Sequence, residues 1–146
     1  MKQRMVWGVA AVSVMLAVGS VQASDQGGKS LYDRLGGKGA ITAVVETFVG
    51  KVGGDARINS YFRSTDLVKL KMHLVNQICE ASGGPCKYTG RTMKQTHAGM
   101  GVSDAAFGAL VEDLVGALDH HKVGKAEKDE LLGVLGPMKT DIVEKK

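Results

Sequence analysis

The sequence predicts an all-α fold. Apolar residues recur at intervals of three and four along most of the chain, which is the spacing of an amphipathic helix, and no stretch alternates apolar and polar residues as a strand does. Twenty glycines and only two prolines fit helices that are joined by tight turns. The 146 residues suffice for one domain of ordinary size.

Residues 1–23 have the pattern of a secretory signal peptide. Lys2 and Arg4 precede an uncharged apolar run, and the small residues up to Ala23 offer a cleavage site. The alternative is a membrane anchor over residues 5–24, because about 20 apolar residues can span a bilayer. Cleavage lowers the basic residues from 19 to 17 against 15 acidic ones, which argues against nucleic acid as a partner. We therefore expect a periplasmic protein.

The first part of the folded domain is expected to hold two helices. Residues 24–29 are polar and glycine-rich and predict a flexible leader, so the domain is expected over residues 30–146. Ser30 begins a short helical turn. The next apolar stripe runs over residues 41–52 and ends at glycines 53–54.

The middle of the chain is expected to hold two more helices. Asp55 is expected to cap a short helix carrying Ile58, Tyr61 and Phe62. Asp66 is expected to cap a longer one. The apolar stripe of that longer helix consists of Leu67, Leu70, Leu74 and Ile78.

Two cysteines flank the turn that ends this longer helix. Cys79 and Cys86 are separated by six residues that include Gly83, Gly84 and Pro85. An oxidising compartment permits a disulfide across the turn, and two small buried thiols are the alternative. No nearby Cys/His pair completes a zinc site.

The C-terminal part predicts two further helices and a charged end. Ser103 is a strong N-cap for a helix whose stripe includes Phe107, Leu110 and Leu114. Pro137 predicts a kink or break in the last helix. The end at residues 144–146 predicts a solvated tail.

His97 stands in a short helical stretch with no Cys, Asp or second His beside it. A lone histidine of this kind is usually a surface or core residue. The motifs around it are Leu31–Gly37, Phe48, Phe62, Gly83–Pro85, Tyr88–Gly90 and Met93–His97. In this order and spacing, over about residues 30–143, they resemble the group I truncated haemoglobins.

The resemblance implies a two-over-two helical sandwich that encloses one haem b, with His97 as the proximal iron ligand. Phe62 matches the phenylalanine that packs on the porphyrin face, and Tyr88 is a candidate for contact with a haem propionate. Other residues expected to line the pocket are Phe48, Leu70, Leu74, Ile78, Met93, Val102, Phe107, Leu110 and Leu135.

The distal side departs from the family pattern at two positions. Val49 stands where group I members usually carry a tyrosine, and Leu74 stands where many carry a glutamine. Those side chains normally donate hydrogen bonds to bound oxygen, so tight oxygen storage by the usual donors is not expected. Gln77 and Tyr61 are possible substitutes.

His73 lies on the helix that the resemblance places on the distal side. In some cyanobacterial and algal members the matching histidine binds iron as an internal sixth ligand. We therefore hypothesise a reversible His97–iron–His73 state. The alternatives are an exposed helix histidine or one that contacts a propionate.

The expected function is reversible binding of a diatomic gas, oxygen or nitric oxide. The protein is expected to be a monomer whose haem iron is reduced by a separate reductase. The alternative is a two-histidine haem protein for electron transfer, redox sensing or nitric oxide detoxification. We expect an oxygen-binding protein rather than an enzyme, with a nitric oxide dioxygenase-like or weak peroxidase activity as the alternative. Peroxidase chemistry has little support, because no distal acid–base pair can be identified. A small exported helical bundle with a structural histidine would instead be colourless.

Overall fold

The computed structural model describes residues 28–146, so the signal peptide predicted at 1–23 and most of the predicted leader lie outside the described residues. Within residues 28–146 every regular element is a helix, which confirms the all-α class. The elements are α1 Leu31–Leu35, α2 Gly37–Gly54, η1 Asn59–Phe62, α3 Leu67–Ala81, α4 Met93–His97, α5 Asp104–His120, α6 Lys125–Leu135, η2 Gly136–Met138 and α7 Lys139–Ile142. None of the helices in this range is both long and apolar enough to cross a bilayer.

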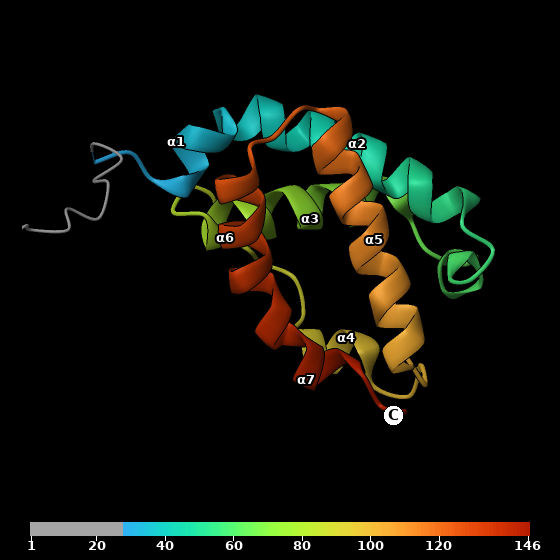
Figure 1. Ribbon diagram of the computed structural model, residues 1–146. Helices are drawn as coiled ribbons and strands as arrows, with labels where there is room; N and C mark the ends of the chain where they lie inside the picture. The colour runs from blue at the N-terminus through green and yellow to red at the C-terminus, as the bar shows by residue number, and fades with distance from the viewer. Residues whose placement is uncertain (1–27) are drawn as a thin grey trace, which may run out of the picture.

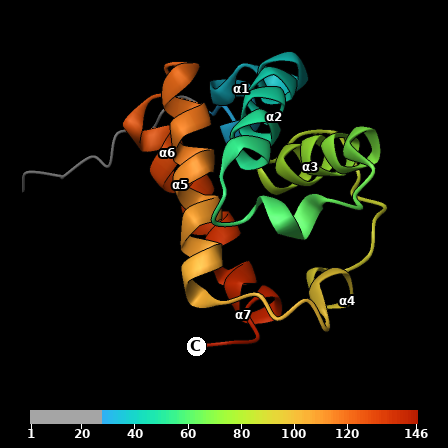
Figure 2. The same ribbon diagram turned by 90° about the vertical axis from the view of Figure 1, so that its right-hand side faces the viewer.

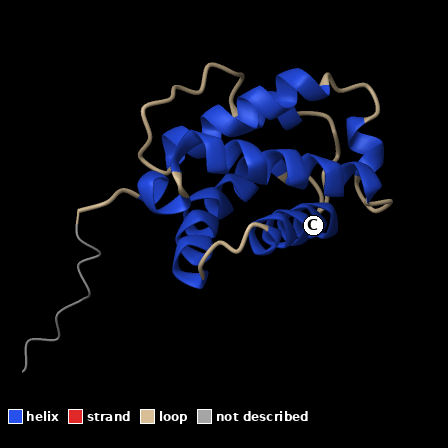
Figure 3. Cartoon of the chain, turned by 90° about the horizontal axis from the view of Figure 1, so that it is seen from above, coloured by secondary structure: helices blue, strands red, loops and turns tan. Residues whose placement is uncertain are grey.

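The four longest helices form two layers. Helices α2 and α3 pack together, α2 also packs against α5, and α6 packs against α1 (Figures 1 and 2). The short helices α4 and α7 contact each other and close one end of the arrangement, away from α1 (Figure 1). Figure 3 shows the same helices from above, with α1 at the end nearest the N-terminus. This is the two-over-two sandwich that the sequence predicted.

Three of the predicted helix caps are present. The Ser30 hydroxyl accepts a hydrogen bond from the Asp33 amide, and the Asp66 carboxylate accepts one from Lys69, each at 3.1 Å. Ser103 caps α5 in the same way. Each cap satisfies a backbone amide that the first turn of a helix leaves without an intrahelical partner.

The segment after α2 differs from the prediction. The predicted short helix is present as the 3-10 helix η1, which carries Tyr61 and Phe62, with Ile58 just before it. Asp55 does not cap this helix, because its carboxylate is bound by the backbone amide and the side chain of Arg57 at 2.8–3.1 Å. A local side-chain hydrogen bond of this kind competes with helix capping.

A disulfide links Cys79 and Cys86 across the turn that follows α3. Cys79 is fully buried and the turn folds tightly over it: a side chain at Gly84 would lie 2.7 Å from the Cys79 sulfur and 2.5 Å from the Tyr32 ring. Glycine is therefore required at this position by close packing.

The C-terminal region breaks where expected but ends differently. Pro137 lies in the 3-10 helix η2, which separates α6 from α7 and confirms the predicted break. The tail at residues 144–146 is exposed, as predicted, but it is also attached to the domain, because the Glu144 carboxylate accepts hydrogen bonds from the amides of Gly99 and Gly101. The tail therefore returns to the segment that follows α4.

Candidate functional site

A cavity of about 1440 Å³ lies between the helices. Small-molecule pockets usually measure about 300–1,000 Å³, so this cavity can hold a large cofactor. Side chains from α2, η1, α3, α4, α5, α6 and α7 contribute to its wall. Most of that wall is apolar, which would keep a bound group away from water.

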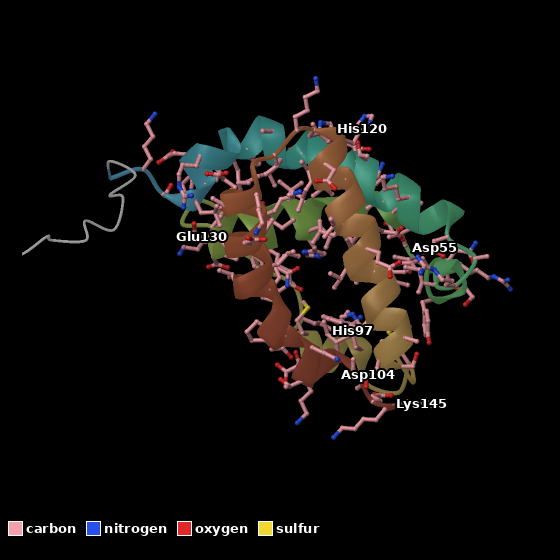
Figure 4. The ribbon with its side chains drawn as sticks, in the orientation of Figure 1. Asp55, His97, Asp104, His120, Glu130 and Lys145 are labelled. Atoms are coloured by element: carbon pink, nitrogen blue, oxygen red, sulfur yellow. A yellow bond between two sulfur atoms is a disulfide. The ribbon has the colours of Figure 1, made fainter. Side chains whose placement is uncertain are left out.

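His97 is the last residue of α4 and lines the cavity. Figure 4 shows it extending from α4 toward the space that α5 and α6 enclose. Its Nδ1 lies 2.7 Å from the Met93 carbonyl oxygen. A carbonyl can only accept, so Nδ1 carries the proton, and a neutral ring then keeps its lone pair on Nε2. Histidines that bind metals are oriented in the same way, by a hydrogen bond that the other ring nitrogen donates.

The N-terminus of α4, the helix that carries His97, is capped by side chains. Thr92 and Gln95 form a capping box, in which each side chain binds the other's backbone amide at 3.1 Å. A helix of five residues is too short to be stable alone, so such local bonds and its neighbours must hold it.

His73 lines the same cavity from α3. Its Nδ1 is buried and has no hydrogen-bond partner among the described residues. Its ring packs edge-on against Tyr88, with ring centroids 5.7 Å apart. A buried polar atom without a partner costs free energy, and a bound group could remove that cost.

Every residue predicted for the pocket lies along this one cavity. These residues are His97, His73, Phe48, Val49, Phe62, Leu70, Leu74, Ile78, Tyr88, Met93, Val102, Phe107, Leu110 and Leu135. They come from segments far apart in the sequence, which the fold brings together. Their presence on one wall shows that they can act jointly.

The prediction missed several other lining residues, including Val52, Leu114 and Ile142. Val52 and Leu114 lie in apolar stripes that the sequence already showed, but helical spacing indicates only that a residue faces inward, not that it lines a cavity. Ile58, which the sequence placed in a short helix, and Met138 also line the cavity.

The two proposed substitute donors differ in what their side chains contact. The Gln77 amide nitrogen lies 3.3 Å from the Met93 sulfur and 3.4 Å from the Met138 sulfur, so it bridges two parts of the wall. Tyr61 also lines the cavity. Val49 and Leu74 offer no donor of their own.

Charges cluster outside the cavity, at the junction of α2 and α5. Arg57 binds both Asp55 and Glu112, and its hydrogen bonds lower the pKa of Asp55 to about 2. Burial, followed by the nearby Asp55 charge, raises the pKa of Asp113 above its ordinary value. One oxygen of the Asp113 carboxylate is buried without a partner.

Comparisons with known proteins agree with this geometry. The family model of the bacterial-like globins matches residues 30–144. A group 1 truncated hemoglobin GlbN of Mycolicibacterium paratuberculosis is 37% identical over 113 residues, which cover 77% of this chain and 83% of that protein. The chain belongs to the group 1 truncated haemoglobins.

Solved truncated haemoglobins share the same fold. The structure from Tetrahymena pyriformis matches with a TM-score of 0.76 at 30% identity, covering 79% of this chain and 98% of that one. The 2/2 hemoglobin of Synechococcus sp. PCC 7002, solved with covalently attached heme, matches with a TM-score of 0.75 at 34% identity over 80% of this chain and all of that one. The two-over-two architecture is therefore that of this haemoglobin group.

The residues of the cavity fit a haem. The wall is large and apolar, His97 has one ring nitrogen fixed as a donor, and His73 has a buried nitrogen without a partner. Imidazole nitrogens are common ligands of haem iron. No group of three or more His, Cys, Asp or Glu side chains that could hold a metal ion occurs within residues 28–146, so a bare metal centre has less support than a haem.

Proposed function

We propose that this truncated haemoglobin holds one haem b through His97 and reversibly binds a diatomic gas, oxygen or nitric oxide. Globins are haem proteins that bind gases, and family membership makes haem-based gas binding the general activity here. The finer proposal is supported by one observation above all: the Nδ1 of His97 is committed to the Met93 carbonyl beside a large apolar cavity. The haem would supply an iron with a position open to gas.

Different residues of the chain would bind the iron, bury the porphyrin and line the cavity edge. His97 would offer Nε2 to the iron, because its other nitrogen is held as a donor. The apolar wall, with Phe48 and Phe62 on it, would bury the porphyrin and exclude water. Tyr88 lies on the cavity wall, and its hydroxyl donates to the Arg91 carbonyl at 2.6 Å, which orients the ring.

The distal wall would not retain oxygen in the usual way. Val49 and Leu74 cannot donate hydrogen bonds, and each missing bond to a charged group forgoes about 1.5–3 kcal/mol. Since 1.4 kcal/mol corresponds to a factor of ten, oxygen would leave roughly 10- to 100-fold faster than from a site with such a donor. Gln77, Tyr61 and His73 line the same cavity and would be the polar groups available to compensate.

A second function, electron transfer or nitric oxide detoxification through a two-histidine haem, is favoured by the buried Nδ1 of His73. That atom has no hydrogen-bond partner among the described residues. A ring that is positioned by the ligand it binds does not need such a bond, so this observation fits His73 as a ligand. His73 would then be a reversible internal sixth ligand that an incoming gas must displace.

Visible spectroscopy tests both functions. The protein is purified, loaded with haemin if needed, reduced, and exposed to carbon monoxide as a probe. Gas binding predicts an intense absorption band near 400 nm that shifts rapidly with carbon monoxide. A low-spin spectrum that resists carbon monoxide would favour the two-histidine function. A protein that stays colourless after haemin is added would overturn both.

We also propose that the protein is exported to the periplasm with loss of residues 1–23. The support is the basic and apolar pattern of that segment, which lies outside the described residues. The intact mass of protein recovered from the periplasmic fraction tests it. A mature chain that retains residues 1–23 would favour the anchor instead.

A further inference from the structure

The chain returns to the segment after His97 at its C-terminal end. The amides of Glu144 and Lys145 donate to the Val102 carbonyl at 2.8 and 3.1 Å, and the Asp104 amide donates to the Lys145 carbonyl at 3.0 Å. Figure 4 shows Asp104 and Lys145 next to each other at the lower end of α5. The tail therefore pairs with the linker between α4 and α5.

The turn directly after His97 leaves two amides free for this tail. The Met100 amide donates to the His97 carbonyl at 3.1 Å, which closes a turn over Ala98 and Gly99. Gly99 and Gly101 have φ angles of 79° and 65°, a left-handed conformation that favours glycine. In this conformation successive amides face one side and form a concave anion-binding surface.

The carboxylate of Glu144 occupies that surface. One oxygen accepts from the Gly99 amide at 2.6 Å and the other accepts from the Gly101 amide at 2.8 Å. Hydrogen bonds to an ionised acceptor are stronger than neutral ones. Glu144 is exposed, so solvent weakens both bonds, but the two oxygens hold two points of the same turn.

Other contacts support the same attachment. Lys139 forms an ion pair with Asp104 at 2.9 Å, which ties α7 to the start of α5. Ile142 and Val102 are both buried and line the cavity. The tail is thus fixed on both sides of Glu144.

We propose that Glu144 is a positioning residue for His97. This rests on the proposed function, in which His97 is the iron ligand. Helix α4 has only five residues, so the direction of the His97 ring depends on what holds each end of the helix. The capping box of Thr92 and Gln95 holds the start, and Glu144 holds the turn that follows the end.

Two substitutions test the inference in the haem-loaded protein. Glu144→Gln replaces one acceptor oxygen with a donor and should speed haem transfer to apomyoglobin about threefold. Glu144→Ala removes both acceptors and should speed it about tenfold. In both variants the iron–histidine stretching band of the reduced protein should shift or broaden in resonance Raman spectra. Amide hydrogen exchange at residues 97–101 should also become faster.

A matched control separates position from charge. Asp129→Asn removes the same charge from an exposed carboxylate whose ion pair lies within α6, so it should leave all three measurements unchanged. A variant of Glu144 that lowers the melting temperature while haem transfer and the Raman band stay at wild-type values would overturn the inference alone. Wild-type protein that takes up no haem would overturn the proposed function and the inference together.

Discussion

His97 and His73 line the same cavity, but the structure constrains them differently. The Nδ1 of His97 binds the Met93 carbonyl, and the turn that follows it is held by Glu144. The buried Nδ1 of His73 has no hydrogen-bond partner within residues 28–146, and its ring packs edge-on against Tyr88. The His97 ring is oriented by a hydrogen bond and the His73 ring is not, a difference that fits the proposed roles of permanent and exchangeable iron ligand.

The largest effect is expected from His97→Ala. Loss of the proposed iron ligand should weaken haem retention by more than the roughly 10- to 100-fold that removal of a supporting partner costs. The measurement is the haem absorbance that remains after gel filtration. His120→Ala is the control, because His120 is exposed at the other end of α5 and outside the cavity (Figure 4). An alanine variant that keeps its full colour with the same bands would contradict the assignment.

Loss of the Cys79–Cys86 disulfide should have the next largest effect and should act on the distal side. The bond closes a short loop, for which chain entropy predicts about 2.5 kcal/mol of stability. Tyr88, two residues after Cys86, packs on His73. The double variant Cys79→Ala/Cys86→Ala should therefore unfold about 5–10 °C lower.

The control for this disulfide is a thiol reductant. It should lower the melting temperature of the wild type and leave the double variant unchanged. If the reductant shifts both proteins equally, the disulfide is not the cause. The band of the His97–iron bond should change less than spectral features that depend on His73.

A smaller effect is expected from His73→Leu. If His73 occupies the sixth position in about nine-tenths of the molecules, its removal should raise the apparent affinity for carbon monoxide about tenfold. The ferric spectrum should change from low to high spin. An unchanged low-spin spectrum would remove His73 from the coordination sphere. His121→Leu is the control, because the His121 ring binds the Thr47 hydroxyl rather than lining the cavity.

The smallest effect is expected from Asp113→Asn. Asp113 lies outside the cavity that His97 and His73 line. Because the pKa of Asp113 is raised, the folded state binds its proton more tightly than the unfolded state does. Its contribution to stability therefore falls as the pH rises from the unfolded pKa, 3.8, through the raised value. Asparagine avoids this loss, so the variant should melt about 2 °C higher at pH 7.

The pH profile checks the sign of this prediction. The advantage of Asp113→Asn should vanish below pH 3.8, where the wild-type carboxyl is protonated in both states. Asp55 behaves in the opposite way: its lowered pKa stabilises the fold above 3.8, and that stability is lost as the pH falls toward about 2. A variant that is less stable at pH 7 would contradict the prediction. At each pH the haem spectrum of the variant should match that of the wild type, which would separate stability from ligation.

The helices were predictable because each carries a local signal. The apolar stripe of residues 41–52, the cap at Ser103 and the break at Pro137 depend on neighbours within a few residues. The short helix η1 was predicted, but its missing side-chain cap was not, because the Asp55 carboxylate can bind either the start of the next helix or Arg57, and only the folded structure decides between them.

The lining of the site was predictable only through the resemblance. Helical spacing shows that Leu70 and Leu74 face inward, but it cannot separate a cavity wall from a solid core. To predict the disulfide one must know the distance between the two Cα atoms. This distance is 5.7 Å and depends on the turn at Gly84. The role of Glu144 was hidden because its partners lie more than forty residues away.

The apolar wall around Val49 and Leu74 also affects how gases enter and leave. Uncharged diatomic molecules dissolve better in hydrocarbon than in water, and dry apolar cavities in proteins take up small nonpolar guests such as xenon. The chamber should therefore act as a reservoir in which gas is more concentrated than in the surrounding solution. A molecule released by the iron would have time to return before it escapes, so laser-flash experiments should detect a large fraction of fast recombination inside the protein.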